Sequence, residues 1–144
     1  TYTADAPEKV IPAPDLEVTL DTIIGDSRVL ELCINPQRDV NRLDVFTDFK
    51  PFDQVAVNGI SLSEKYISRR RGSKLITHYI SDNDPTEIKM HFPKDSIFEL
   101  TLYEASNDLL RNDLFSIPTR DASNIPMPFV LNDAILTISN WTFE

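Results

Sequence analysis

Histidine is the side chain most often used as a metal ligand or general base, so the two histidines of this chain come first. His78 and His91 lie thirteen positions apart on strand-like segments that follow one another, and could therefore approach each other. A zinc site needs three or four ligands, and no other residue is spaced to complete the set. The pattern favours two solvated or packed histidines and predicts no metal site.

A run of oxygen-bearing side chains, Asp82-Asn83-Asp84 followed by Glu87, is similar to the beginning of a calcium-binding loop. The EF-hand loop also requires a glycine at its sixth position and a distal glutamate, and both are missing here. Asp and Asn ahead of Pro85 are strong turn formers. The segment is therefore predicted to be a turn and not a metal site.

Nucleophilic and carboxylate catalysis both lack a sequence signature. No serine lies in a G-x-S-x-G elbow. Cys33, the only cysteine, lies in an apolar run where it is expected to pack as a small hydrophobic residue. With 23 acidic residues, neighbouring carboxylates arise by chance, so they do not identify a glycosidase. The sequence predicts no catalytic and no cofactor-binding residue, and leaves any binding residue unknown.

Charge narrows the class of partner. The formal net charge is −9, so a nucleic-acid backbone or an anionic membrane is not expected as the main partner. The local exception is Arg69-Arg70-Arg71, which could bind a phosphate or an acidic partner surface. The alternative, which we favour, is an exposed loop that offsets local negative charge.

One modification motif is present near the end of the chain. Asn140-Trp141-Thr142 fits the N-glycosylation pattern, which matters only in a eukaryotic secretory compartment. Because the motif lies inside a predicted strand, we interpret the match as coincidence.

Strands are the elements that must position these residues. Asp15–Ile24 alternates apolar and polar side chains, and Gly25-Asp26 permits a reversal into Arg28–Ile34, so a hairpin is predicted. Asn58-Gly59 is the strongest turn signal in the chain. The strand-like segments are Asp15–Ile24, Arg28–Ile34, two runs within Val40–Leu62, Lys74–Ile80, Glu87–Phe92, Phe98–Glu104 and Ala134–Phe143.

Several segments between and within these runs carry their own expectations. Ser63–Ser73 is predicted to be a loop or an exposed strand end. Lys74–Ile80 is apolar on both parities apart from His78, which suggests a central strand covered on both faces or lying at a sheet interface. Ser106–Ser123 fits either a short helical turn or a loop. Ile125–Pro128 is expected to be extended because of its prolines.

These patterns predict an all-β fold, an antiparallel β-sandwich of jelly-roll or Ig-like type with about eight strands and little helix. The chain of 144 residues is long enough for one core. We expect residues 1–14, rich in Pro and Ala, to be a linker from an upstream segment, and residues 15–144 to form a single β-sandwich domain. No apolar run approaches a membrane span, so no direct membrane insertion is expected.

The order of these features resembles the C-terminal domain of membrane-embedded M28-family metallopeptidases, including the endoplasmic-reticulum and vacuolar-membrane enzymes and their bacterial relatives. The resemblance covers most of the chain and consists of strands and turns, without a catalytic signature. The residues that carry it are Ala6-Pro7 to Pro14, Leu16 to Ile34, Val55-Ala56-Val57-Asn58-Gly59, Ile125-Pro126-Met127-Pro128 and Asp133 to Phe143.

This resemblance implies a zinc-dependent aminopeptidase domain and transmembrane helices upstream, with the present domain on the extracytoplasmic side, periplasmic or lumenal. The family's zinc ligands belong to the peptidase domain, and no residue here can inherit them. The chain is therefore expected to be a non-catalytic accessory domain. Its expected partners are the peptidase and transmembrane domains of the same chain, which it would position or stabilise, and peptide substrates that it would present.

Two other classes of function remain open. A carbohydrate-binding or adhesion-like sandwich would stack sugars on exposed aromatic side chains, and the candidates are Tyr66, Tyr79, Tyr103 and Trp141. The parity of Trp141 within the last strand favours a core position. The third class is an independent hydrolase, and the only residues that support it are carboxylates without a specific catalytic pattern.

Overall fold

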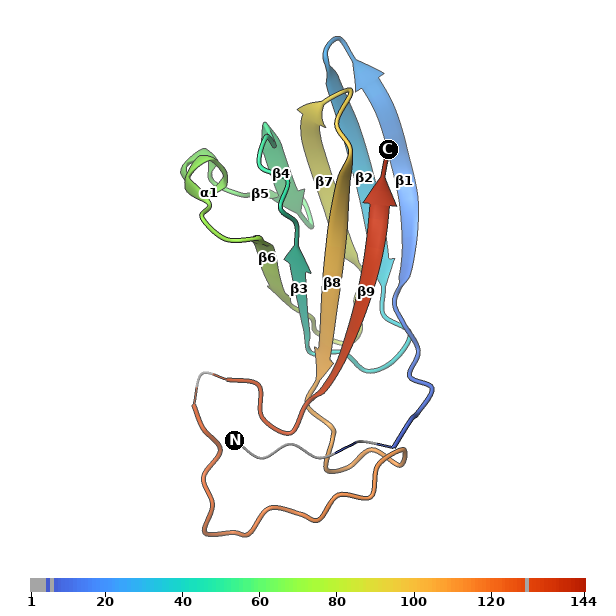
Figure 1. Ribbon diagram of the computed structural model, residues 1–144, viewed down its shortest axis with the longest axis vertical. Coiled ribbons are helices and arrows are strands. Elements are labelled where there is room, and N and C mark those ends of the chain that lie inside the picture. The colour runs from blue at the N-terminus through green and yellow to red at the C-terminus, as the bar shows by residue number, and fades with distance from the viewer. Residues whose placement is uncertain (1–4, 6, 129) are drawn as a thin grey trace.

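Two antiparallel sheets face each other in the computed structural model, which describes residues 5, 7–128 and 130–144 (Figure 1). The described residues form nine strands and one short helix, so the predicted antiparallel β-sandwich is confirmed, with nine strands in place of about eight. Sheet A has the order β1 (Asp15–Ile24), β2 (Ser27–Asn35), β7 (Thr86–Pro93), β4 (Gln54–Val57), β5 (Ile60–Ser61). Sheet B has the order β6 (Lys74–Tyr79), β3 (Arg42–Phe46), β8 (Phe98–Ser106), β9 (Ile135–Phe143).

The strand order matches one of the two sandwich types expected. In an immunoglobulin-type sandwich, strands A, B and E form one sheet and strands C, F and G the other. Here β1, β2 and β7 form the first set and β3, β8 and β9 the second, in the same sequence order. β4 continues sheet A beyond β7, and β6 continues sheet B beyond β3. The arrangement is therefore Ig-like in its strand pattern.

The core lies between the sheets and is built from the alternating residues of each strand. Ile88, Met90 and Phe92 of β7 are buried, as their alternation predicted. An aromatic cluster closes one end, where the ring centroids of Phe92 and Phe98 are 4.9 Å apart and those of Phe98 and Phe143 are 5.4 Å apart. This cluster joins β7 of sheet A to β8 and β9 of sheet B.

The predicted hairpins form where turn residues allow a left-handed backbone. β1 pairs with β2 through a turn in which Gly25 has a φ of 64°. β4 pairs with β5 through Asn58 and Gly59, whose φ values of 48° and 77° are typical of a type I′ turn. Both reversals were predicted from the turn residues alone.

The prediction of a loop or strand end over Ser63–Ser73 is wrong for residues 64–69, which form helix α1 (Glu64–Arg69), and holds for residues 70–73, which carry neither helix nor strand. The Ser63 hydroxyl accepts a hydrogen bond from the Tyr66 backbone N–H at 3.2 Å and so caps the helix. Ile67 of α1 is buried in the core. One cap and one buried side chain hold a helix whose composition is otherwise polar.

The prediction of a central strand over Lys74–Ile80 is also wrong, because β6 lies at the edge of sheet B. The register between β3 and β6 shifts between Val45 and Phe46, so that Leu75 and Ile76 are both buried although they are consecutive. A bulge of this kind places two neighbouring side chains toward one face. The apolar residues on both parities therefore reflect a bulge and not two covered faces.

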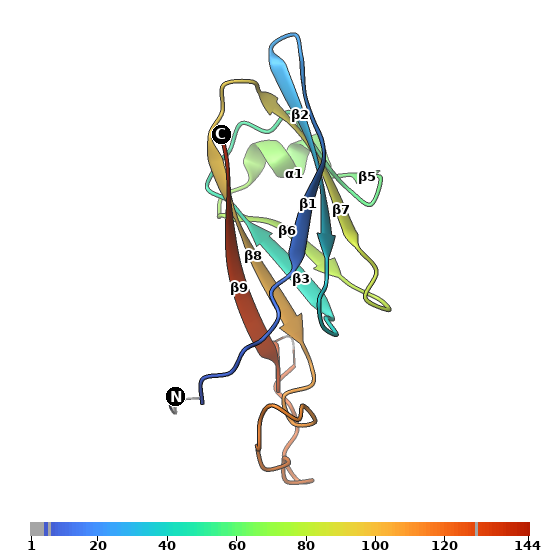
Figure 2. The same ribbon diagram turned by 90° about the vertical axis from the view of Figure 1, so that its right-hand side faces the viewer.

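The segment between β8 and β9 comprises residues 107–134, and its described residues extend beyond one end of the sandwich (Figures 1 and 2). Its described residues form turns but no helix. Two of these turns are closed by hydrogen bonds between residues three apart, from Arg111 N–H to Asp108 O at 2.8 Å and from Phe115 N–H to Asn112 O at 3.2 Å. Of the two readings for Ser106–Ser123, the loop holds for residues 107–123, while Ser106 ends β8. Residues 7–14 of the predicted linker carry neither strand nor helix, whereas residues 1–4 and 6 lie outside the described part of the chain.

Candidate functional site

The two histidines do not form a pair. His78 lies on β6 of sheet B and His91 on β7 of sheet A, so they are neighbours along the chain but not within a sheet. His78 Nδ1 is 2.9 Å from the Thr86 hydroxyl, and burial lowers the pKa of His78. Within the described part of the chain, no group of three or more His, Cys, Asp or Glu side chains could hold a metal ion.

The turn at Asp82 and Asn83 is confirmed. Both residues have a positive φ, 52° and 58°, which Asp and Asn tolerate better than most side chains. The Asn83 side chain accepts a hydrogen bond from the Val40 backbone N–H at 3.0 Å and donates one to Asp39 at 2.7 Å. The amide of Asn83 therefore ties this turn to the start of β3.

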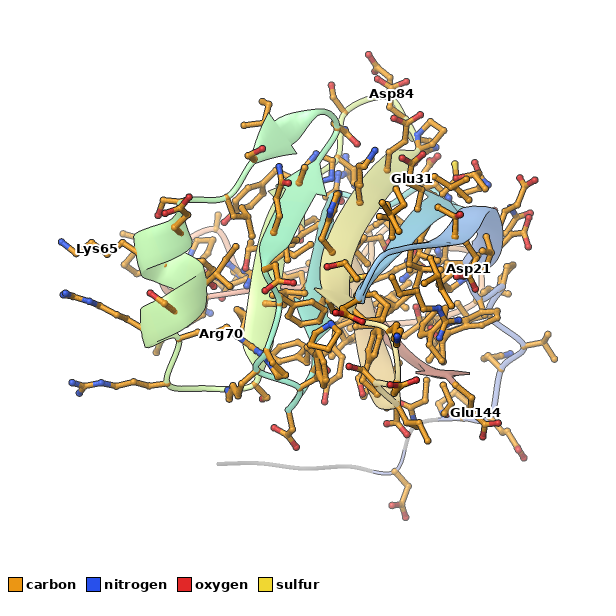
Figure 3. All side chains as sticks on the ribbon, turned by 90° about the horizontal axis from the view of Figure 1, so that it is seen from above. Asp21, Glu31, Lys65, Arg70, Asp84 and Glu144 are labelled. Carbon is orange, nitrogen blue, oxygen red and sulfur yellow. The ribbon has the colours of Figure 1, made fainter. Side chains whose placement is uncertain are left out.

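The arginine run forms part of a concave surface beside α1. This surface, here called the basic hollow, has a volume of about 520 Å³ and opens to solvent. Figure 3 shows Lys65 and Arg70 on the side of the molecule where α1 lies. The charged and aromatic side chains that line the basic hollow are Lys65, Tyr66, Arg69, Arg70, Arg71 and Lys74.

Arg70 has a structural role in this surface. Its guanidinium donates to the backbone carbonyls of Thr47 and Ser73, each at 2.8 Å, and also to that of Phe49. Burial lowers the pKa of Arg70, while the nearby Asp48 opposes this effect. The reading of Arg69-Arg70-Arg71 as a plain exposed loop therefore needs correction, because Arg70 is half-buried and Arg69 ends a helix.

The other cations of the basic hollow differ in what they contact. Lys74 pairs with Asp44 at 3.1 Å. Lys65, Arg69 and Arg71 make no ion pair or side-chain hydrogen bond to any residue that the structure describes. Three positive charges in one hollow are thus uncompensated by the described protein.

The outer face of sheet B holds a charged group that sequence reasoning missed. Asp44 of β3 is buried and pairs with Arg42 at 2.8 Å and Lys74 at 3.1 Å, and the Thr77 hydroxyl also donates to it. Burial alone would raise the pKa of Asp44, but the hydrogen bonds from Thr77, Lys74 and Arg42 lower it below 3.8. In the sequence, Asp44 is an ordinary polar residue of an alternating strand.

A second buried charge lies between the sheets. The Glu104 side chain of β8 is only 1% exposed, and neither carboxylate oxygen has a hydrogen bond of good geometry within the described structure. Burial raises the pKa of Glu104, and the neighbouring Arg38 and Thr137 oppose part of this rise. Arg38 donates to the Glu104 backbone O at 3.0 Å and to the Thr137 hydroxyl at 3.2 Å. The sequence pattern predicted Glu104 only as the last residue of a strand and gave no sign that its side chain is buried.

The four candidate aromatic residues do not form one platform. Tyr66 lies on α1 and donates its hydroxyl to Leu75 O at 3.0 Å, whereas Trp141 packs against the core, as its parity predicted. Tyr79 and Tyr103 both lie on the outer face of sheet B, where Tyr79 is 71% exposed and Tyr103 contacts Phe46 with ring centroids 4.8 Å apart.

Asn140 of the glycosylation motif is exposed on β9, at the edge of sheet B. Its cross-strand neighbour is Thr101 of β8. The side chain is therefore accessible in the folded protein.

Exposed apolar side chains gather on the segment 107–134. Ile125 is 90% exposed, Met127 66% and Val130 54%. Leu114, Ile117 and Leu131 of the same segment are exposed as well. The local contacts that hold this segment are polar, such as Arg120 with Asp133 and the Asn132 amide with Met127 O at 2.6 Å.

Comparison of the chain with protein-family models, with curated proteins and with solved structures finds no match. No helix among the described residues is long and apolar enough to cross a membrane. The resemblance to M28-family metallopeptidases therefore stays a prediction.

Proposed function

We propose that this chain is a non-catalytic accessory domain of a larger protein, which the sequence resemblance suggests is a membrane-bound, zinc-dependent M28-type metallopeptidase. The observation that supports this most is the segment 107–134. Its described residues carry six exposed large apolar side chains and extend beyond the sandwich, away from the core (Figure 1).

Loop length and exposure together favour a docking role. Segments longer than about 12–15 residues without secondary structure are uncommon in compact domains and are usually functional, linkers or disordered. Single exposed apolar residues are ordinary, but several on one projecting segment are typical of a surface that another protein covers. Burying Ile125 and Met127 against a neighbouring domain would remove apolar surface from water and hold the two domains together.

In this proposal the sandwich is attached to the extracytoplasmic side of the membrane through upstream transmembrane helices. It positions or stabilises the peptidase domain and presents peptide substrates. β1 and β9 are outer strands of their sheets, so an extended peptide could add to either strand. Zinc belongs to the upstream peptidase domain, and the described residues here contribute no ligand group.

The first test is the sequence and topology of the full-length gene product. The proposal expects zinc-ligand motifs and membrane helices ahead of Thr1. A full-length product without them would contradict the assignment to this family, and ligand screening of the isolated sandwich would then be the next step.

The second test changes the docking segment in the full-length protein. The double variant Ile125→Ser/Met127→Ser should lower both peptidase activity and the melting temperature of the peptidase domain. Ile60→Ser is the matched control, because the exposed fraction of Ile60, 75%, lies between those of Ile125 and Met127, while Ile60 lies at the β4–β5 turn, away from the segment. If the double variant behaves like the control in both measurements, the docking role is wrong.

A carbohydrate-binding module is the second candidate, favoured by Tyr79 and Tyr103 on one outer face of sheet B. Sugars stack on exposed aromatic rings, and Tyr79 offers one. A glycan array probed with the wild-type chain and with Tyr79→Ala should show hits that the variant loses. An array without hits would dismiss this candidate.

A further inference from the structure

The basic hollow beside α1 is not used by the proposed function, and its charge is unlike that of the rest of the chain. Five of the 14 Lys and Arg residues line it, in a chain whose formal net charge is −9. We propose that the basic hollow binds a phosphate or sulfate group carried by a ligand.

The available charge supports this proposal. Arg70 is committed to backbone carbonyls and Lys74 to Asp44, as described above. Lys65, Arg69 and Arg71 have no acidic partner among the described residues. A guanidinium presents its N–H donors in a planar fork that matches the oxygens of phosphate or sulfate, so Arg69 and Arg71 are suited to hold such a group.

The backbone around the hollow is fixed before any ligand arrives. Arg70 connects Thr47 and Phe49 on one side to Ser73 on the other. The Tyr66 hydroxyl, which donates to Leu75 O at 3.0 Å, fastens α1 to β6. A site whose supporting groups are already in place loses less entropy when it binds a ligand.

Size and net charge limit the ligand to one with a single anionic group or a few. The hollow of 520 Å³ lies within the range of small-molecule sites, about 300–1,000 Å³. A long polyanion such as a nucleic acid would also meet the acidic remainder of the surface and be repelled. A small phosphate- or sulfate-bearing group meets only the local positive field.

The test follows the arginine side-chain Nε–H signals of the 15N-labelled chain by NMR. Inorganic phosphate and inorganic sulfate are titrated separately at low ionic strength, since added salt screens such contacts. Sodium chloride at matched ionic strength is the reference. We expect the Arg69 and Arg71 signals to shift and saturate with phosphate or sulfate, and not with chloride.

Variants distinguish a specific anion site at Arg69 and Arg71 from nonspecific attraction between the anion and any positive charge of the chain. Arg69→Gln/Arg71→Gln should weaken phosphate binding by about tenfold or more, equivalent to about 1.4 kcal/mol. Lys9→Gln/Arg111→Gln removes the same charge from two exposed positions away from α1 and should leave binding unchanged. Arg69→Lys/Arg71→Lys keeps the charge but loses the fork, so an intermediate loss is expected. Unchanged backbone amide signals over 64–67 show that α1 is intact.

Equal shifts with chloride, or equal weakening in the Lys9/Arg111 variant, would show an adventitious ion only and overturn the proposal. Vesicles of phosphatidylcholine with and without phosphatidylglycerol identify the source of the phosphate. Sedimentation with the anionic vesicles, lost in Arg69→Gln/Arg71→Gln, would assign a lipid headgroup. Phosphate binding without vesicle binding would assign a soluble ligand.

Discussion

Two buried carboxylates illustrate how the surroundings of a residue decide its effect on stability. Asp44 is held by Arg42, Lys74 and Thr77, so its charge is compensated where it lies. Glu104 is buried between the sheets with no well-formed hydrogen bond to its carboxylate among the described residues. Removing the partners of a buried charge destabilises the fold, because the charge is then left uncompensated, and a poorly partnered buried charge costs free energy from the start.

Asp44→Asn is expected to destabilise the chain by about 1.5–3 kcal/mol near neutral pH, because it weakens charged hydrogen bonds to a buried group. Since the pKa of Asp44 is lowered in the fold, its contribution is present above pH 3.8 and is lost as pH falls through the folded pKa. Urea unfolding of wild type and variant at pH 7 and pH 3 measures this. A difference that does not shrink at pH 3 would contradict the prediction.

Glu104→Gln is expected to change stability with the opposite dependence on pH. The pKa of Glu104 is raised above 4.5 in the fold, so the wild type loses stability as pH rises from 4.5 through the folded pKa. Glutamine does not ionise, so the stability of the variant relative to wild type should increase from pH 4 to pH 8. Thermal unfolding across this range measures the trend, with Glu99→Gln on the exposed side of β8 as control.

At the scale of elements, two short elements depend on single turn or cap residues. They are α1, which lies beside the basic hollow, and β5, which lies at the edge of sheet A. Ser63 caps α1, and Gly59 closes the turn between β4 and β5. Neither α1 nor β5 is long enough to be stable alone, since an isolated short helix or hairpin is marginal in water. Each depends on its local signal and on the sandwich beneath it.

Gly59→Ala is expected to destabilise the β4–β5 turn by about 1–2 kcal/mol, because an L-residue is strained at the φ of 77° that this turn requires. Gly72→Ala serves as the control, since Gly72 has no positive φ and an added methyl group would have space. The melting temperature of each variant tests the prediction. Equal effects at the two glycines would show that the turn geometry does not limit stability.

Ser63→Ala is expected to lower stability by about 1 kcal/mol through loss of the helix cap. The change should be local, since the Ser63 hydroxyl accepts its hydrogen bond from the Tyr66 N–H in the first turn of α1. Hydrogen exchange at the Tyr66 and Ile67 amides should therefore become faster, while exchange in β7 should be altered less. Uniform acceleration throughout the sandwich would contradict a local role for the cap.

At the scale of the whole molecule, one hydrophobic core lies between the two sheets and holds them together. The aromatic cluster of Phe49, Phe52, Phe92, Phe98 and Phe143 connects both sheets at one end. The basic hollow depends on the same core, because Ile67 of α1 packs into it.

Phe92→Ala is expected to cost about 3–5 kcal/mol of unfolding free energy, because it leaves a cavity among rings contributed by both sheets. Ile138→Ala on the exposed outer face of β9 should cost far less. Urea denaturation compares the two variants. A small effect of Phe92→Ala would show that the cluster does not hold the sheets together.

Local patterns were sufficient for much of this fold. Period-two alternation predicted β7 and β9, Asp15–Ile24 was located with its observed ends, and the turns at Gly25 and Gly59 followed from residues that tolerate a positive φ. These features depend on neighbours along the chain, so the amino-acid sequence by itself determined them.

Only the tertiary structure decided which strands pair and which side chains from different strands come into contact. The bulge in β6 depends on its pairing with β3, and it accounts for the apolar residues on both parities that suggested a central strand, whereas the strand order places β6 at an edge. His78 and His91 separated because β6 and β7 enter different sheets, whereas Asp44 acquired Lys74 and Thr77 because β3 and β6 share one sheet. Contacts between distant segments depend on register and sheet assignment, which local alternation does not encode.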